Sequence, residues 1–265
     1  MDFTDQVIWV TGASSGIGEG LVRALDLVGA KLILSSRNVD ELERVRTTCT
    51  RPHDHMVVPL DLSKQTEFPA AAAQVLEHYE RIDVLINNGG ISQRAYAVDA
   101  TAESERSLME VDYFGPVALT KTVLPSMRHH RAGRVVVISS VMGYVGTPAR
   151  SSYAAAKHAL HGYFDSLRAE LWQENIKVLI VCPGYVQTAV SANAINAVGE
   201  KHGRTDLTHQ RGITVERCVR VVLRGIARDR EEIAVGGFEV FAIYLKRFLP
   251  WLYSRVVRRM TFIEK

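Results

Sequence analysis

The letters TGASSGIG, residues 11–18, constrain the possible folds more than any other stretch of this sequence. They follow the apolar run VIWVT, which is typical of a buried strand, and they precede a segment with helical spacing. A glycine-rich turn between a strand and a helix brings bare backbone and free helix N–H groups together, which suits a pyrophosphate. The GxxxGxG spacing, with no Lys-Ser or Lys-Thr pair after it, disfavours an ATP-type phosphate loop. The alternative, a plain turn, needs only one glycine.

Each residue of this loop has an expected task. Gly12 is expected to make the tight turn, while Gly16 and Gly18 let the backbone approach a phosphate and let the helix pack on the sheet. The helix is expected to begin near Ile17, and the two serines add hydroxyl donors. The predicted phosphate-binding residues are Gly12, Ser14, Ser15, Gly16, Ile17 and Gly18.

Apolar runs and segments with helical spacing alternate along the rest of the chain. The runs from VIWVT to EIAVGG are continuous, which is typical of strands that are buried on both faces of a parallel sheet. This alternation predicts an α/β fold, a doubly wound parallel sheet of about seven strands with helices on both faces. We expect one domain over residues 1–237, with a substrate lid at 184–212, and a C-terminal extension at 238–265.

Composition excludes several classes of protein. The 265 residues are 47% hydrophobic and 23% charged, an ordinary globular balance, and the net charge of +3 is too small to argue for nucleic acid. The three cysteines form no CxxC pair, so we expect reduced thiols in a reducing compartment. The acidic N-terminus does not resemble a signal peptide, and no apolar run approaches the ~18 residues of a membrane span. A cytoplasmic location is therefore expected.

The end of the second predicted strand, LILSSRN, bears on the choice of cofactor. A free ribose 2′-hydroxyl usually meets an acid at this position, whereas a 2′-phosphate needs a cation. The sequence has Ser36 and Arg37 here and no acid before Asp40, which predicts NADP(H) in preference to NAD(H). The alternative is an exposed arginine that only ends the strand.

Tyr153 and Lys157, in SSYAAAKHAL, lie four residues apart and therefore on one face of a predicted helix. A tyrosine with its free pKa of about 10 is a poor acid or base at neutral pH. A neighbouring ammonium and the positively charged nicotinamide ring of a cofactor favour the phenolate and bring that pKa closer to neutral pH. An isolated YxxxK pair fits a surface helix equally well, so the other motifs decide.

The order of motifs resembles the short-chain dehydrogenase/reductase family over residues 5 to about 235. TGASSGIG is followed by Asp-Leu at 61–62, NNGG at 87–90, GRVVVISS, YAAAK and then CPG at 182–184. Each motif is weak alone, but their combination is specific. The resemblance implies a single Rossmann-type domain that transfers hydride between NAD(P) and a carbonyl/alcohol pair.

The resemblance also implies catalytic roles for individual residues. Tyr153 matches the family's general acid/base, and Lys157 matches its partner. The family's catalytic serine precedes the tyrosine by thirteen positions, which selects Ser140, although the residues alone leave Ser139 open. The serine hydroxyl would hold the substrate carbonyl as charge develops on its oxygen.

Further positions match the family's cofactor-binding segments. Asp61 and Leu62 match the pair that recognises the adenine ring. Asn88 matches an Asn-Ala-Gly element that is altered here to Asn-Gly-Gly, a change expected to be tolerated because it only removes a methyl group. The residues that match the cradle of the nicotinamide carboxamide are Pro183, Gly184, Val186 and Thr188.

One position departs from the family pattern. The fourth catalytic residue of the family is an asparagine, and the matching residue in MEVDYFGPVALT is Asp112. A main-chain role survives this change, but a carboxylate could attract Lys157 or raise pKa values nearby. We expect an active enzyme with a modified pH profile; much reduced activity is the alternative.

The C-terminal extension combines seven aromatic residues and six Lys/Arg with only two acids. This mixture suits an amphipathic helix on a membrane surface, and the alternative is a helix that covers the substrate pocket or packs on another subunit. The extension and the stretch VCPGYVQTAVSANAI resemble the dehydrogenase/reductase member 7B subgroup. Neighbouring members handle steroids, retinoids and lipid-like carbonyls, which implies a hydrophobic ketone or aldehyde and its alcohol as the substrate pair. The candidate pocket residues, besides the lid, are Ile91, Ser92, Met142, Tyr144 and Tyr185.

These expectations describe an NADP(H)-dependent oxidoreductase that could contact a membrane peripherally. The alternative is a catalytically weak NADP(H)-binding sensor or a membrane-docked interaction protein. No metal site is expected, because His158, His161 and the pair at 129–130 lack an acid or cysteine at ligand spacing and fit surface or interface positions. The resemblance implies a homodimer or homotetramer, for which small residues at 154–156, 159 and 160 could allow close helix packing.

Overall fold

A computed structural model of the chain describes residues 3–204 and 206–260, and its centre is one parallel sheet of seven strands. The strand order is β3-β2-β1-β4-β5-β6-β7, and every neighbouring pair is parallel. The expected doubly wound α/β fold is confirmed, whereas the expected domain boundary after residue 237 stays a prediction. The strands are β1 Val7–Thr11, β2 Lys31–Ser35, β3 Met56–Val57, β4 Val84–Asn87, β5 Gly133–Ile138, β6 Ile176–Pro183 and β7 Glu232–Val235.

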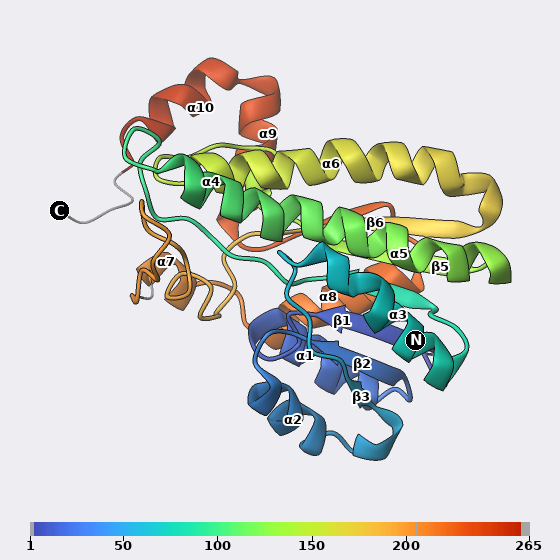
Figure 1. Cartoon of the computed structure of the whole chain (residues 1–265). Coiled ribbons are helices and arrows are strands. Elements are labelled where there is room, and N and C mark those ends of the chain that lie inside the picture. Colours follow the sequence, from blue (N-terminus) through green and yellow to red (C-terminus); the bar gives the residue numbers. More distant parts are fainter. Residues whose placement is uncertain (1–2, 205, 261–265) are drawn as a thin grey trace.

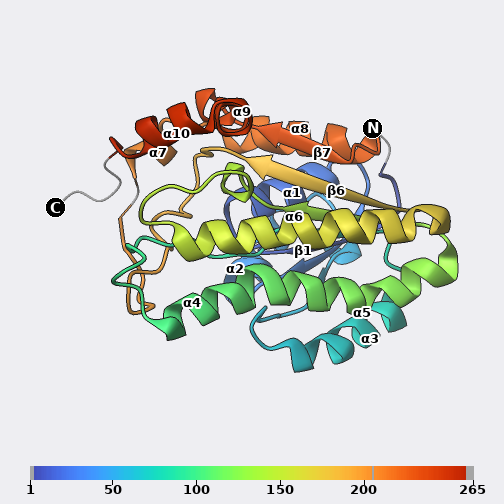
Figure 2. The ribbon, with the colours of Figure 1, turned by 90° about the horizontal axis from the view of Figure 1, so that it is seen from above.

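Helices cover both faces of the sheet (Figures 1 and 2). One face packs against α1 (Gly16–Asp26), α2 (Val39–Thr47) and α8 (Val215–Ala227), and the other against α3 (Phe68–Tyr79), α5 (Gly115–His130) and α6 (Ser151–Leu171). Side chains alternate between the two faces along each strand, so Ile8 and Val10 enter one core while Val7 and Trp9 enter the other. This double burial explains the continuous apolar runs in the sequence.

The strand order reverses next to β1, because the chain adds β2 and β3 on one side and then crosses back to add β4 on the other. Such a reversal opens a crevice at the carboxyl ends of β1 and β4, where ligands bind in this kind of fold. Near this crevice, α4 (Ala102–Met109) continues into α5 through the π-helical turn Glu110–Phe114, whose Val111 and Asp112 line the cavity described below. π-helical turns of this kind occur frequently at functional sites.

Two segments extend from the sheet over this crevice. In its described residues, the expected lid at 184–212 contains the short helix α7 (Leu207–Gln210) and bridges Gln93 through Ile195. The C-terminal extension forms α9 (Phe241–Phe248) and α10 (Pro250–Val257), which pack against Val141 and Val145 in the segment after β5 (Figure 1). Residues 261–265 of the extension lie outside the described residues. Short 3₁₀ turns cover Pro52–Asp54, Gln65–Glu67, Val141–Gly143, Trp172–Glu174 and Phe238–Val240.

Candidate active site

One cavity of about 1310 Å³ runs along the carboxyl ends of the strands and under the lid and the extension. All but two of the individual residues predicted to bind cofactor or substrate, or to act in catalysis, line it; the exceptions are Gly18 and Tyr144. The structure therefore brings together positions that are spread over most of the sequence. The lining includes Ser14, Ser15, Ile17, Leu62, Pro183, Val186 and Thr188, as well as the residues described individually below.

The glycine-rich loop is fixed by hydrogen bonds between two strand ends. The Thr11 hydroxyl accepts the backbone N–H groups of Asn88 and Gly89 at 3.0 and 2.9 Å. The Asn88 side-chain amide donates to the carbonyls of Thr11 and Gly12 at 2.9 and 3.3 Å. Gly12 has a φ of +64°, a conformation that glycine adopts without strain. These contacts set the backbone of the loop without any ligand.

Gly18 serves the packing of α1 on the glycine-rich loop and does not face the cavity. A Cβ atom at this position would lie 2.1 Å from the carbonyl oxygen of Gly12 and 2.6 Å from the Asn88 amide. The missing side chain lets the first turn of α1 pack directly on the loop. Of the two expected tasks, close packing is the one that the geometry of Gly18 serves, and its backbone does not line the cavity.

Arg37 lines the cavity just after β2. It is the only positive side chain among the lining residues at 35–38 and 60–62. Asn38 is engaged as the N-cap of α2, where its Oδ1 accepts the Glu41 N–H at 3.2 Å. Asp61 accepts the N–H and hydroxyl of Ser63, at 3.0 and 2.8 Å. Partial burial raises the pKa of Asp61, but these bonds and the charge of Arg37 outweigh it and hold the pKa below its usual value.

The two serines after β5 point in different directions. The Ser139 hydroxyl is buried, lies 3.0 Å from Nε2 of His161, and donates to the main-chain carbonyl of Lys157 at 3.4 Å. The Ser140 hydroxyl accepts the Met142 N–H at 3.1 Å and donates to the Pro183 carbonyl at 3.4 Å. Ser140 thus lies between the two chain segments that border the catalytic end of the cavity, while the Ser139 side chain is committed to the protein interior.

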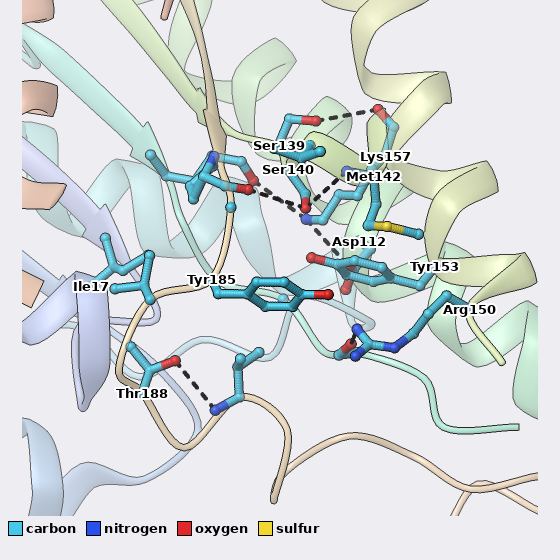
Figure 3. A pocket seen from close by; sticks show the side chains of 18 of the residues that line it. Ile17, Asp112, Ser139, Ser140, Met142, Arg150, Tyr153, Lys157, Tyr185 and Thr188 are labelled. Carbon is cyan, nitrogen blue, oxygen red and sulfur yellow. Dashed lines mark hydrogen bonds and ion pairs between the residues drawn. The ribbon is translucent and has the colours of Figure 1, made fainter. Parts of the chain in front are cut away.

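Tyr153 and Lys157 project from one face of α6 into this end of the cavity (Figure 3). The Lys157 ammonium lies 5.5 Å from the centre of the Tyr153 ring. It also donates to the Ile138 carbonyl at 3.3 Å, so β5 and α6 together fix its position. The candidate substrate residues Ile91, Met142 and Tyr185 line the same cavity.

Asp112 forms a buried ion pair with Lys157. One carboxylate oxygen lies 3.1 Å from the ammonium, and the other accepts the Ile91 N–H at 2.7 Å. Complete burial raises the pKa of Asp112, and Lys157 opposes that effect. Burial alone would lower the pKa of Lys157, but Asp112 and Tyr153 raise it above its usual value. The carboxylate therefore holds Lys157 as an ammonium.

Glu239 is a residue of this site that the sequence did not reveal. Its carboxylate accepts the backbone N–H groups of Tyr185 and Gly237 at 2.8 and 2.9 Å. A Cβ atom on Gly184 would lie 2.0 Å from this carboxylate, so a larger residue there would force the Glu239 side chain to move. One of only two acids in a basic aromatic segment was the available signal.

Two expectations about individual side chains are wrong. Tyr144 does not line the cavity; its ring centre lies 4.5 Å from that of His161 in an edge-on arrangement, and its carbonyl accepts Lys246 at 2.7 Å. His161 is not a surface residue, because its half-buried ring contacts Ser139 and Cys182 through Nε2. Of the five residues expected to allow close packing between subunits, Ala154, Ala156 and Leu160 are buried within their own chain, and the packing itself stays a prediction.

A buried cluster of Asp26, Cys49 and His55 lies at the far end of α1, where sequence analysis expected no metal ligands. The Asp26 carboxylate already accepts the N–H and hydroxyl of Thr50 at 2.6 and 2.8 Å, and His55 at 3.0 Å. The Asp26 carboxylate therefore already has hydrogen-bond donors from the protein. These bonds tie α1 to the loop before β3.

Comparisons with known proteins agree with this geometry. Residues 6–198 match the family model described as short chain dehydrogenase. "Dehydrogenase/reductase SDR family protein 7-like" of Anopheles gambiae is 41% identical over 96% of this chain and 82% of its own length. "Dehydrogenase/reductase SDR family member 7B" of Mus musculus is 38% identical over 95% of this chain and 80% of its own length.

Solved structures show the same fold. A short-chain dehydrogenase from Streptomyces avermitilis has a TM-score of 0.83 at 30% identity and covers 98% of this chain and 100% of its own. One from Burkholderia cenocepacia, in complex with NADP, has a TM-score of 0.80 at 25% identity, over 97% and 99% of the two chains. A Burkholderia phymatum neighbour, in complex with NAD, has a TM-score of 0.83 at 21% identity, over 100% and 99%. The chain belongs to the short-chain dehydrogenase/reductase family of oxidoreductases and resembles its members 7 and 7B over most of its length.

Proposed function

We propose that the protein is an NADP(H)-dependent oxidoreductase that interconverts a hydrophobic ketone or aldehyde with its alcohol. The observation that carries the proposal is the convergence of Ser140, Tyr153 and Lys157 at one end of a cavity whose other end is a glycine-rich loop. A pyrophosphate would suit that loop, because Gly12 and the N-terminus of α1 at Gly16 both line the cavity.

In this proposal the cofactor supplies or accepts the hydride, and the side chains handle the substrate oxygen. The Ser140 hydroxyl donates a hydrogen bond to that oxygen as negative charge develops on it. Tyr153 gives the oxygen a proton during reduction and removes one during oxidation. Lys157 stabilises the phenolate form of Tyr153 through its positive charge and would hold the ribose hydroxyls of the cofactor.

Arg37 supports the preference for NADP(H). It lines the groove where the ribose 2′ position is expected, and the nearest acid in the lining, Asp61, is turned to Ser63. A guanidinium there can form a charge-assisted pair with a 2′-phosphate. Related folds bind either cofactor, as the complexes with NADP and NAD illustrate.

Apolar side chains of the extension support a hydrophobic substrate. They line the cavity together with Val141, Met142 and Val145. Members of this family act on small molecules, and a lipid-like, steroid-like or retinoid-like carbonyl suits such a wall. The contributing residues are Phe238, Phe241, Ala242, Leu245, Phe248, Leu249, Val256 and Val257.

The decisive test is Tyr153→Phe, measured as NADPH oxidation with a panel of apolar ketones and aldehydes. Removing the proton donor should lower kcat by about 10²–10⁴-fold and leave NADPH binding intact. Tyr163→Phe is the matched control, because Tyr163 lies on the same helix and does not line the cavity. Full turnover in Tyr153→Phe would overturn the proposal.

A second candidate function is a catalytically weak NADP(H)-binding sensor. The buried ion pair favours it, since Asp112 offsets part of the charge that Lys157 would otherwise direct at Tyr153. A sensor would bind NADPH and turn over no carbonyl, and Asp112→Asn would then increase turnover strongly.

We also propose peripheral membrane contact through the outer face of the extension. Its inner face packs on Val141 and Val145. Trp251 is 58% exposed and does not line the cavity, and Phe238 and Phe248, which do line it, are still 87% and 74% exposed. Basic residues at 246, 247, 255, 258 and 259 accompany these rings, a combination that favours an anionic lipid surface. No helix within the described residues is long and apolar enough to cross a bilayer.

Vesicle co-sedimentation tests this contact. Vesicles with anionic lipid should retain the protein better than neutral ones, and Phe248→Ser with Trp251→Ser should reduce binding. Trp172→Ser is the control, because Trp172 is 68% exposed but lies after α6, outside the extension. Equal binding by both variants would exclude this face. The expected homodimer or homotetramer is a separate proposal, tested by light scattering in solution.

A further inference from the structure

Two buried arginines share one carboxylate beside the catalytic tyrosine. The side chains of Arg94 and Arg150 are only 1% and 9% exposed, and both contact Asp206 of the lid. Arg94 is held closely, with its Nε 2.9 Å from the carboxylate, whereas the Arg150 guanidinium is 3.4 Å away. Both also donate to the Ser92 hydroxyl, at 3.2 and 3.1 Å.

The charges of this cluster do not balance among the described residues. Arg94 also donates to the Gln93 carbonyl at 2.7 Å, so its Nε and both of its Nη atoms have hydrogen-bond partners. Arg150 leaves its Nε–H buried with no partner in the described part of the chain. Burial, followed by the charge of Arg94, lowers the pKa of Arg150 to about 10. An uncompensated buried guanidinium is costly, which indicates that a missing anion completes the cluster.

Arg150 also faces the space where a substrate would lie. It lines the cavity, whereas Arg94 and Asp206 do not. It immediately precedes α6, three residues before Tyr153, and it interacts electrostatically with Tyr153 and Tyr185. Figure 3 shows its guanidinium directed toward the two tyrosine rings. A purely structural cross-link would not need a guanidinium directed into the cavity.

Building on the proposed function, we infer that Arg150 is an oxyanion subsite, so the substrate is a carbonyl compound with a carboxylate or similar oxyanion and an apolar body. The oxyanion accepts an Nη–H of Arg150 in a charge-assisted hydrogen bond, because the Nε atom is enclosed by the protein while the side chain retains 9% of its exposure. The carbonyl then reaches Ser140 and Tyr153, and the apolar body lies against the extension. Most of the substrate is hydrophobic, and one charged end fixes its orientation.

Matched ketones that differ only in charge test this subsite. The probes are 4-oxononanoic acid and its methyl ester, each assayed as NADPH oxidation on the full chain. A preference in kcat/KM for the acid of about 10-fold or more is expected, the size of one charge-assisted hydrogen bond. Arg150→Gln should bring the acid-to-ester ratio close to one. Arg204→Gln, an exposed arginine of the lid, should keep the preference.

A binding measurement keeps the inference independent of turnover. Calorimetric titration of the NADPH complex with the acid and with the ester should show tighter binding of the acid. Equal affinities, or an acid preference that survives Arg150→Gln, overturn the subsite. If the acid binds through Arg150 but neither probe nor any ketone of the panel is reduced, the subsite stands and the proposed oxidoreductase function fails.

Discussion

The two ends of the cavity are built in different ways. At the cofactor end, the Thr11 hydroxyl and the Asn88 amide bond to main-chain groups at the ends of β1 and β4 and so fix the backbone of the glycine loop. At the substrate end, side chains from the lid, the extension and the segment after β5 meet across long stretches of sequence, as Glu239 does with Tyr185. The first end depends on backbone geometry, whereas the second depends on which distant segments pack together.

This difference predicts opposite tolerance to substitution. A backbone cradle tolerates no added atoms, because the chain itself would have to move. A wall of side chains can be repacked, and its changes should alter substrate choice more than folding. The next predictions are arranged to test that contrast.

The largest effect is expected for Gly18→Ala. The new methyl group would lie 2.1 Å from the Gly12 oxygen, so the loop or α1 must shift. We expect a loss of stability of roughly 1–3 kcal/mol and a fall in NADPH affinity of about 10–100-fold. Thermal unfolding and fluorescence titration with NADPH measure the two effects.

Gly162→Ala is the matched control for this prediction. Gly162 is exposed in α6, and a Cβ there meets nothing within 4 Å. Alanine should stabilise the helix by about 0.5–1 kcal/mol and leave NADPH affinity unchanged. Equal behaviour of the two variants would mean that the cofactor end is not a rigid backbone cradle.

The same difference explains what sequence analysis could predict. Strand pattern and the spacing of Tyr153 and Lys157 are local, so the sheet and the shared face of α6 could be predicted from the sequence. The partners of His161 and Glu239 lie about 20 and 54 residues away, and no local pattern encodes such contacts. The ion pair of Asp112 was foreseen only as an attraction to Lys157, because its burial depends on the π-helical turn.

An intermediate effect is expected for Arg37→Ser at the outer edge of the cofactor end. Losing the guanidinium should weaken NADPH binding by about 10-fold and leave NADH binding nearly unchanged, because only the 2′-phosphate uses that charge. Arg46→Ser is the control, since Arg46 lies on α2 and pairs with Glu43 away from the cavity. Parallel titrations with both cofactors measure the ratio, and an equal loss for NADH would contradict the role of Arg37.

The smallest effect is expected for Asp112→Asn, a nearly isosteric substitution that removes the negative charge paired with Lys157. Asp112 raises the pKa of Lys157, so the ammonium of the unmodified enzyme persists to higher pH. Without the carboxylate, Lys157 loses its proton at lower pH, because the negative charge that favours its ammonium is gone. The limb of the pH profile for alcohol oxidation that Lys157 sets should therefore move to lower pH, with the maximal rate changed only a few-fold.

Asp165→Asn separates this local effect from a general loss of negative charge, because Asp165 lies on α6, as Lys157 does, but is exposed and pairs with Arg168. Its profile should coincide with that of the unmodified enzyme. An unchanged profile in Asp112→Asn would mean that the ion pair does not control the protonation of Lys157. A large increase in rate at every pH would instead favour the sensor, in which Asp112 restrains a complete but suppressed catalytic site.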